Sequence, residues 1–337
     1  MALKFSSTRR TRTRLASTLA MAAVAALPFA AQASYSEIIA FGDSLSDNGN
    51  VYSAIRLPAG PYDQRFSNGP VAVEVMANAL GVGLRDFAYG GALVGEDNRA
   101  FEGVPELGNT GLQSQIADYL DDLGDAGQTA DASALYFMWG GGNDFLGAST
   151  PELPATADYV VSTLSSHVTQ LHGAGAREFF VVGQADLAYT ADNAAADPAT
   201  QEAAHQFTLA YNDALAGAMT QLQGSLEGAT IHLFNPNATL VSLREQLLAQ
   251  GGELGTPCWD GDYLGQGTQC ANPDQYFLWD EVHPTAVVHT AVGQAMAAAV
   301  PEPTVTGLAL VGLLVAGMAA RRSAKRSSRS AQCKSQA

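Results

Sequence analysis

The segment 34–300 contains no lysine, and its positive charges are six arginines, at positions 56, 65, 85, 99, 177 and 244. Of the 33 acidic residues in the chain only Glu302 lies outside this segment, which leaves it a net charge of −26. A surface of that charge repels phosphate backbones, so nucleic acid is excluded as an expected partner. The same repulsion disfavours strongly anionic membranes.

The chain also lacks the motifs of several enzyme classes. Neither G-x-x-x-x-G-K nor G-x-G-x-x-G occurs, which disfavours binding of nucleotide phosphates. G-x-S-x-G is absent as well, which disfavours the nucleophile elbow of the α/β-hydrolase fold. The six histidines and three cysteines do not have the spacing of metal ligands, so we expect neither a metal nor a cofactor.

Cysteine is scarce, and Cys333 lies in the C-terminal tail. The other two, Cys258 and Cys270, lie in one glycine-rich stretch of the main segment. In a small loop of an exported domain, such a pair is expected to form a disulfide.

The first 33 residues have the composition of a secretory signal. Residues 1–14 carry basic side chains and no acid, and the apolar run 15–30 follows. Ala31-Gln32-Ala33 then gives the small-x-small pattern that signal peptidase accepts, so we expect cleavage after Ala33. The alternative is a membrane anchor that is never cut, for which the apolar run is short.

The C-terminal end mirrors this arrangement. Pro301-Glu302-Pro303 precedes the uncharged segment 304–320, and basic residues follow. An uncharged segment with a positive end predicts a membrane span. The three parts together resemble the PEP-CTERM sorting signal, which implies export, processing by an exosortase-like enzyme and delivery to the cell surface. A plain C-terminal anchor is the alternative. We therefore expect a signal peptide at 1–33, a main domain at 34–300 and a sorting segment at 301–337.

Strand-like and helical patterns alternate through the main domain. Strand character is found at 38–41, 84–88, 134–138, 178–182 and 231–234. Helical patterns are found at 71–80, 112–120, 159–171, 200–222, 240–248 and 286–299. This alternation predicts an α/β fold, a three-layer α/β/α sandwich with a central five-stranded parallel sheet. Functional residues of such sheets lie on loops beyond the carboxyl ends of the strands.

The loop after the first strand carries a serine, Ser44, beside a turn-forming aspartate, Asp43. A serine nucleophile needs a base, a group that orients the base, and donors for the developing oxyanion. Asp280 and His283 can supply the first two, because a carboxylate three residues before a histidine can reach back to its Nδ1 proton. By itself this spacing is common on protein surfaces.

Two glycine-rich segments can supply the donors. Gly90 and Gly91 follow the second strand, and Gly141-Gly142-Asn143-Asp144 follows the third. Glycine lets the backbone approach a ligand closely, and the Asn143 amide can point at an oxyanion. Either segment alone would be read as an ordinary turn after a strand.

Taken in order, these four segments resemble the sequence blocks of the SGNH or GDSL hydrolases, and GDSLSDNGN at 42–50 resembles their lipase, esterase and haemolysin-like branch. The resemblance implies the flavodoxin-like fold of that family. It makes Ser44, Asp280 and His283 the expected catalytic residues. The oxyanion hole that it implies consists of the Ser44 N–H, the Gly91 N–H and the Asn143 side chain.

The function that the resemblance implies is hydrolysis of a carboxylic ester through an acyl-enzyme on Ser44. The substrate would be a lipid, a small ester or an acylated glycan, and the enzyme would be secreted or surface-delivered. Removal of acetyl groups from an O-acetylated exopolysaccharide is one alternative, and a catalytically silent surface binding module is another. Acyl transfer to a second alcohol also remains open, because an acyl-enzyme permits it.

Overall fold

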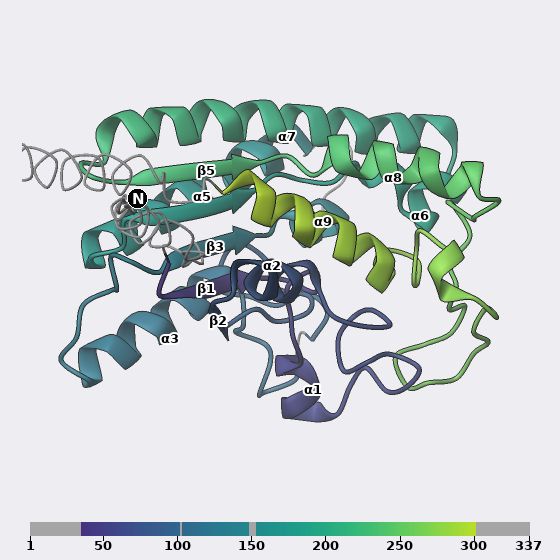
Figure 1. Cartoon of the computed structure of the whole chain (residues 1–337), viewed down its shortest axis with the longest axis horizontal. Coiled ribbons are helices and arrows are strands. Elements are labelled where there is room, and N and C mark those ends of the chain that lie inside the picture. Colours follow the sequence, from purple (N-terminus) through teal and green to yellow (C-terminus); the bar gives the residue numbers. More distant parts are fainter. Residues whose placement is uncertain (1–34, 102, 148–152, 301–337) are drawn as a thin grey trace, which may run out of the picture. The chain divides into compact units, whose positions relative to one another are not determined.

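The computed structural model describes residues 35–101, 103–147 and 153–300 (Figure 1). The expected signal peptide and sorting segment, including the apolar stretch 304–320, lie outside these residues. Among the residues described, no helix is both long enough and apolar enough to cross a membrane.

A sheet of five parallel strands forms the centre of the fold, in the order β2-β1-β3-β4-β5. The strands are β1 Glu37–Gly42, β2 Gly83–Asp86, β3 Leu135–Trp139, β4 Glu178–Val182 and β5 Thr230–Phe234. The order 2-1-3-4-5 is the flavodoxin-like one, so the expected fold class is confirmed. The central strands β1 and β3 are almost wholly buried, as the strands of a sheet covered on both faces should be.

The helices are α1 Asn50–Ile55, α2 Ala72–Leu80, α3 Leu112–Asp125, α4 Gly142–Gly147, α5 Leu153–Ala174, α6 Ala191–Ala195, α7 Pro198–Ser225, α8 Asn237–Ala249 and α9 Ala286–Ala299. Alternate side chains of β1 enter two different cores. Ile39 and Phe41 pack with residues of α3, α5 and α7, whereas Ile38 and Ala40 pack with residues of α2, α8 and α9. The three layers are therefore present, and Figure 1 shows α2 and α9 in front of the strands.

The expected disulfide between Cys258 and Cys270 is present. A cross-link that closes a loop of this size contributes about 3 kcal/mol to the free energy of unfolding in the chain-entropy model. The bridged loop packs inward through Trp259, whose ring lies edge-on to Tyr62, and Tyr62 in turn lies edge-on to Trp279. The disulfide thus anchors a loop that packs against Tyr62.

Candidate active site

Ser44, His283 and Asp280 form one chain of hydrogen bonds. The Ser44 Oγ lies 2.7 Å from His283 Nε2, although 239 positions separate the two residues. On the other side of the ring, His283 Nδ1 lies 2.8 Å from Asp280 Oδ2. The structure therefore brings together the three residues that the sequence predicted, at the distances that proton transfer from a serine requires.

A tight turn at the end of β1 presents Ser44. The Asp43 Oδ1 accepts the Leu45 N–H at 3.0 Å, and the Asp43 carbonyl accepts the N–H of Ser46. Gly42 has no room for a side chain, since a Cβ there would lie 2.8 Å from the carbonyl oxygen of Trp139. Burial raises the pKa of Asp43 to about 6. The Asp43 carboxyl thus holds the turn and does not take part in the hydrogen-bonded chain.

Gln115 on α3 fixes the residue from which this turn departs. Its side chain accepts the Gly42 N–H at 2.9 Å and donates to the Gly42 carbonyl at 2.8 Å. Gln115 is buried, so both of these hydrogen bonds are shielded from water, and the Gly42 carbonyl also accepts the Tyr89 N–H at 3.2 Å. Sequence reasoning missed this residue, because it looks like one more position of an amphipathic helix.

The Asp280 carboxylate accepts hydrogen bonds from several donors. It accepts the backbone N–H groups of Val282 at 3.0 Å and His283 at 2.8 Å, and the hydroxyl of Tyr62 at 2.8 Å. Burial raises the pKa of Asp280, but the His283 ring and the backbone N–H groups of Val282 and His283 outweigh that effect, so its pKa lies below the ordinary value. Asp280 is consequently ionised at neutral pH and can orient and charge-stabilise the imidazole. Tyr62 lies in an irregular loop, and nothing in the sequence marked it as a partner.

Three N–H donors face the cleft that contains Ser44. Within the described residues, the backbone N–H groups of Ser44 and Gly91 donate to no protein acceptor. The Asn143 amide gives one hydrogen to the Ala92 carbonyl at 3.0 Å, which fixes the amide and leaves its second hydrogen available. Ser44, Gly91, Asn143 and His283 all line one cleft of about 250 Å³. This is the arrangement expected of an oxyanion hole.

Asp47 ties the first loop to the second. Its Oδ1 accepts the N–H groups of Gly49 at 2.8 Å and Asn50 at 2.6 Å. Its Oδ2 accepts those of Val51 at 3.3 Å and Gly90 at 2.9 Å. Burial raises the pKa of Asp47, and these four donors oppose that shift. The residue next to Gly91 is therefore bonded directly to the loop that carries the serine.

Aromatic and apolar side chains form the walls of the cleft. The rings of Phe66 and Tyr263 lie beside the His283 ring, with centroid distances of 5.3 and 6.5 Å. Tyr263 belongs to the disulfide-bridged loop, and its position there was not expected from the sequence. Leu187 and Thr190 form a second wall of the cleft.

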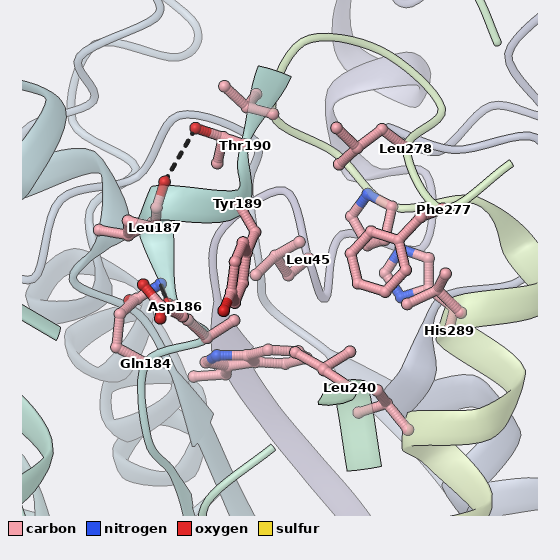
Figure 2. Close-up of a pocket in the computed structure, with 16 residues that line it drawn as sticks. Leu45, Gln184, Asp186, Leu187, Tyr189, Thr190, Leu240, Phe277, Leu278 and His289 are labelled. Atoms are coloured by element: carbon pink, nitrogen blue, oxygen red, sulfur yellow. Dashed lines mark hydrogen bonds between the residues drawn. The ribbon is translucent and has the colours of Figure 1, made fainter. Parts of the chain in front are cut away.

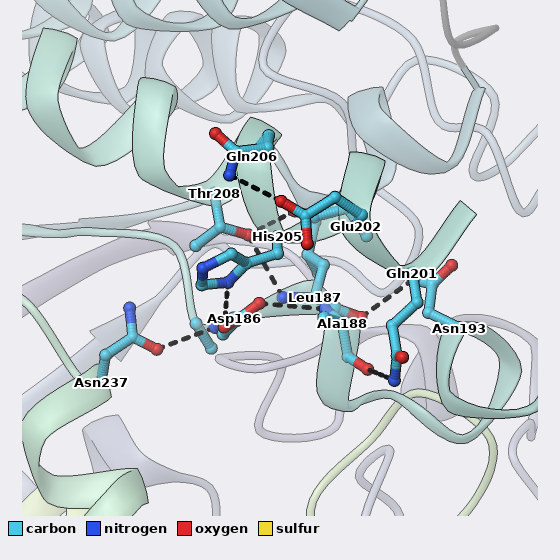
Figure 3. A network of polar contacts seen from close by, with 12 residues as sticks. Asp186, Leu187, Ala188, Asn193, Gln201, Glu202, His205, Gln206, Thr208 and Asn237 are labelled. Atoms are coloured by element: carbon cyan, nitrogen blue, oxygen red, sulfur yellow. Dashed lines mark hydrogen bonds and ion pairs between the residues drawn. The ribbon is translucent and has the colours of Figure 1, made fainter. Parts of the chain in front are cut away.

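A polar network braces this second wall (Figure 3). The Asp186 carboxylate caps the 3₁₀ turn Leu187–Tyr189 and lies 2.7 Å from His205 Nδ1 on α7. The Asp186 N–H donates to the Asn237 side chain at the start of α8, at 2.8 Å. Within the described residues no hydroxyl is bonded to His205. This second Asp–His pair holds the 3₁₀ turn against α7. No three acidic, histidine or cysteine side chains in the described part of the chain are grouped so that they could hold a metal ion.

The chain is similar to known proteins of one family. The model of the GDSL-like Lipase/Acylhydrolase family matches residues 38–296. The chain is 25% identical to the phosphatidylcholine-sterol acyltransferase of Aeromonas hydrophila, over 78% of this chain and 89% of that protein. It is 26% identical to the thermolabile hemolysin of Vibrio parahaemolyticus, over 77% of this chain and 62% of that protein.

A solved carbohydrate acetylesterase from Sinorhizobium meliloti has 14% identity and a TM-score of 0.41, over 78% of this chain and 96% of that chain. The family match covers most of the present chain, from β1 into α9. This chain belongs to the family of GDSL-like lipases and acylhydrolases, and it is accordingly a carboxylic ester hydrolase.

Proposed function

We propose that the protein is an exported esterase that cleaves carboxylic esters through an acyl-enzyme on Ser44. The observation that carries this proposal is the hydrogen-bonded chain from the Ser44 hydroxyl through His283 to the Asp280 carboxylate. It lies in a cleft whose free N–H groups can stabilise an oxyanion.

Each half of the reaction uses the same groups. His283 Nε2 removes the Ser44 proton while the Ser44 Oγ attacks the ester carbonyl, and the carbonyl oxygen gains the negative charge. The bond to the alcohol then breaks, and the alcohol leaves with the proton held by His283. A water molecule, deprotonated by His283, attacks the acyl-serine, and the acid and the free hydroxyl of Ser44 are the products.

The Asn143 amide is expected to stabilise that negative charge. Replacing Asn143 with alanine should lower kcat by roughly 10²–10³-fold, the usual loss for one oxyanion donor. The measurement is hydrolysis of p-nitrophenyl butyrate, with the melting temperature as the control for folding. A loss smaller than tenfold would remove Asn143 from this role.

Covalent labelling tests the proposed function directly. A fluorophosphonate should modify the purified protein once, and peptide mass spectrometry should locate the adduct on Ser44. A panel of p-nitrophenyl esters, a phospholipid and an acetylated xylan then separates simple esters, lipids and glycan esters as substrates. Absence of both labelling and hydrolysis would identify a catalytically silent binding module instead.

Acyl transfer is a second candidate reaction. The name of the Aeromonas relative, a phosphatidylcholine-sterol acyltransferase, favours it, and an alcohol can replace water in the second step. Adding an alcohol acceptor to the assay and measuring the new ester would distinguish transfer from hydrolysis.

Export to an oxidising compartment is also part of the proposal. The signal-like sequence at 1–33 and the sorting-like sequence at 301–337 suggest it. The Cys258–Cys270 disulfide supports it, because such bonds persist outside the reducing cytosol.

A further inference from the structure

A second pocket, of about 90 Å³, adjoins the catalytic cleft (Figure 2). The residues that line both cavities are Leu45, Gln184, Leu187, Thr190 and Val282. Leu45 directly follows Ser44 in the chain, so the wall between the cavities begins one residue from the expected nucleophile.

The lining of this second pocket is predominantly apolar. Beyond the shared wall its lining includes apolar side chains from α8, α9 and the segment before α9, among them Leu240, Phe277, Leu278, Val288 and Val292. Trp139, Asp186 and Tyr189 also line it. Figure 2 shows Leu45 between the Tyr189 and Phe277 rings. The Arg244 guanidinium lies over both of these rings, 4.0 and 5.1 Å from their centroids, and holds them in place.

We propose that this pocket receives the acyl chain of the ester and restricts it to about four carbons. This inference rests on the proposed function. It adds the length of the acyl chain, which the cleft alone does not define. The acyl carbon becomes bonded to the Ser44 Oγ, and the chain then passes Leu45 into the pocket. The alcohol is left on the opposite side, in the cleft lined by Gly91, Arg99 and Tyr263.

The size of the pocket sets the limit on chain length. A cavity of about 150 Å³ binds benzene, which has six carbons. By proportion, 90 Å³ holds roughly three or four carbon atoms, so an acetyl group underfills the pocket and a butyryl group fills it.

Two buried N–H groups in the lining add a second limit. His289 Nδ1 accepts the Ala72 N–H at 3.2 Å, so the neutral ring carries its proton on Nε2. Neither this Nε2 nor the Trp139 Nε1 has an acceptor among the described residues. Packing carbon against unpaired donors is unfavourable. A chain longer than butyryl would have to pack against these donors and would therefore gain less than its added area suggests.

Variants at Leu240 test this assignment, because Leu240 lines the pocket and does not line the catalytic cleft. Burying one methylene changes binding by roughly fourfold, so wild-type kcat/KM should rise roughly tenfold from p-nitrophenyl acetate to butyrate. In Leu240→Trp, the ratio of kcat/KM for butyrate to kcat/KM for acetate should fall roughly tenfold. In Leu240→Ala, the optimum should move to hexanoate.

Leu248→Trp is the matched control, since Leu248 is on the same helix and is 59% exposed. It should keep the wild-type chain-length profile. Melting temperatures and fluorophosphonate labelling rates show whether each variant is folded and competent. If both Leu240 variants reacted with the fluorophosphonate but kept the wild-type chain-length profile, the assignment of the pocket would be overturned. The proposed function would not be affected by that result. If the wild-type protein neither labelled nor hydrolysed any ester, the proposed function itself would fail.

Discussion

Replacing Ser44 with alanine should abolish ester hydrolysis and leave the fold unchanged. Removal of the nucleophile from a serine–histidine–aspartate relay costs on the order of 10⁶-fold in kcat. The Ser44 Oγ has His283 as its hydrogen-bond partner and supports no backbone group, so its loss should cost little stability. The measurements are hydrolysis of p-nitrophenyl acetate and butyrate, fluorophosphonate labelling and the melting temperature.

Ser46 provides the matched control in the same turn. Its hydroxyl is buried and has no hydrogen-bond partner among the described residues. Ser46→Ala should therefore retain activity within about twofold of the wild-type enzyme. Ester turnover by Ser44→Ala within about tenfold of wild type, or an adduct at another residue, would rule out Ser44 as the nucleophile.

Replacing Asp280 with asparagine should lower kcat on the order of 10⁴-fold, the loss measured for this change in a serine protease triad. The side-chain oxygen of the new asparagine could still accept the N–H groups of Val282 and His283, so the turn should persist. Its NH₂ group, however, would face His283 Nδ1 and favour the tautomer that carries the proton on Nε2. That nitrogen would then donate to Ser44 and could no longer accept its proton.

The Tyr62→Phe variant tests the contribution of one hydrogen bond to Asp280 without changing the charge of Asp280. This change removes one donor to the Asp280 carboxylate, whereas the charge beside His283 remains. We expect a loss of about tenfold or less, read as kcat for p-nitrophenyl butyrate. If Asp280→Asn also retained activity within tenfold of wild type, another carboxylate would have to orient the histidine.

The sheet could be predicted because its strands are short, apolar and separated by helical patterns. All five strands lie within two residues of the expected ranges. The second strand ends at Asp86, two residues earlier than expected, and the Asp86 carboxylate accepts the Ala88 N–H at 2.9 Å just beyond this end. That bond depends on a side-chain conformation, which a hydrophobic pattern does not report.

Three short helices were not predicted. α1, α4 and α6 have five or six residues each, too few for a periodic pattern to stand out. The case of α4 affects the site, because Gly142 and Asn143 form its first turn although their sequence is typical of a loop. The helix fixes the direction of the Asn143 side chain, which the motif alone left undefined.

The expected catalytic residues could be located because Ser44 lies just after the first strand and Asp280 and His283 share one short segment before the last helix. Their supports could not be, since Tyr62, Gln115 and Asp47 act through contacts between segments distant in the chain. The wall formed by Tyr263 likewise depends on how the bridged loop folds back over the cleft. Such contacts arise only when the tertiary structure is complete.

The four bonds accepted by Asp47 have a consequence for how the rim of the sheet moves. Because the Asp47 carboxylate is hydrogen-bonded both to the serine loop and to Gly90, a displacement of one segment should displace the other as well. The distance between the Ser44 Oγ and the Gly91 N–H would then stay nearly constant during thermal motion. The alignment of nucleophile and oxyanion donor with the ester carbonyl carbon would thus depend on the coupling between the two loops, and not on the stiffness of either loop.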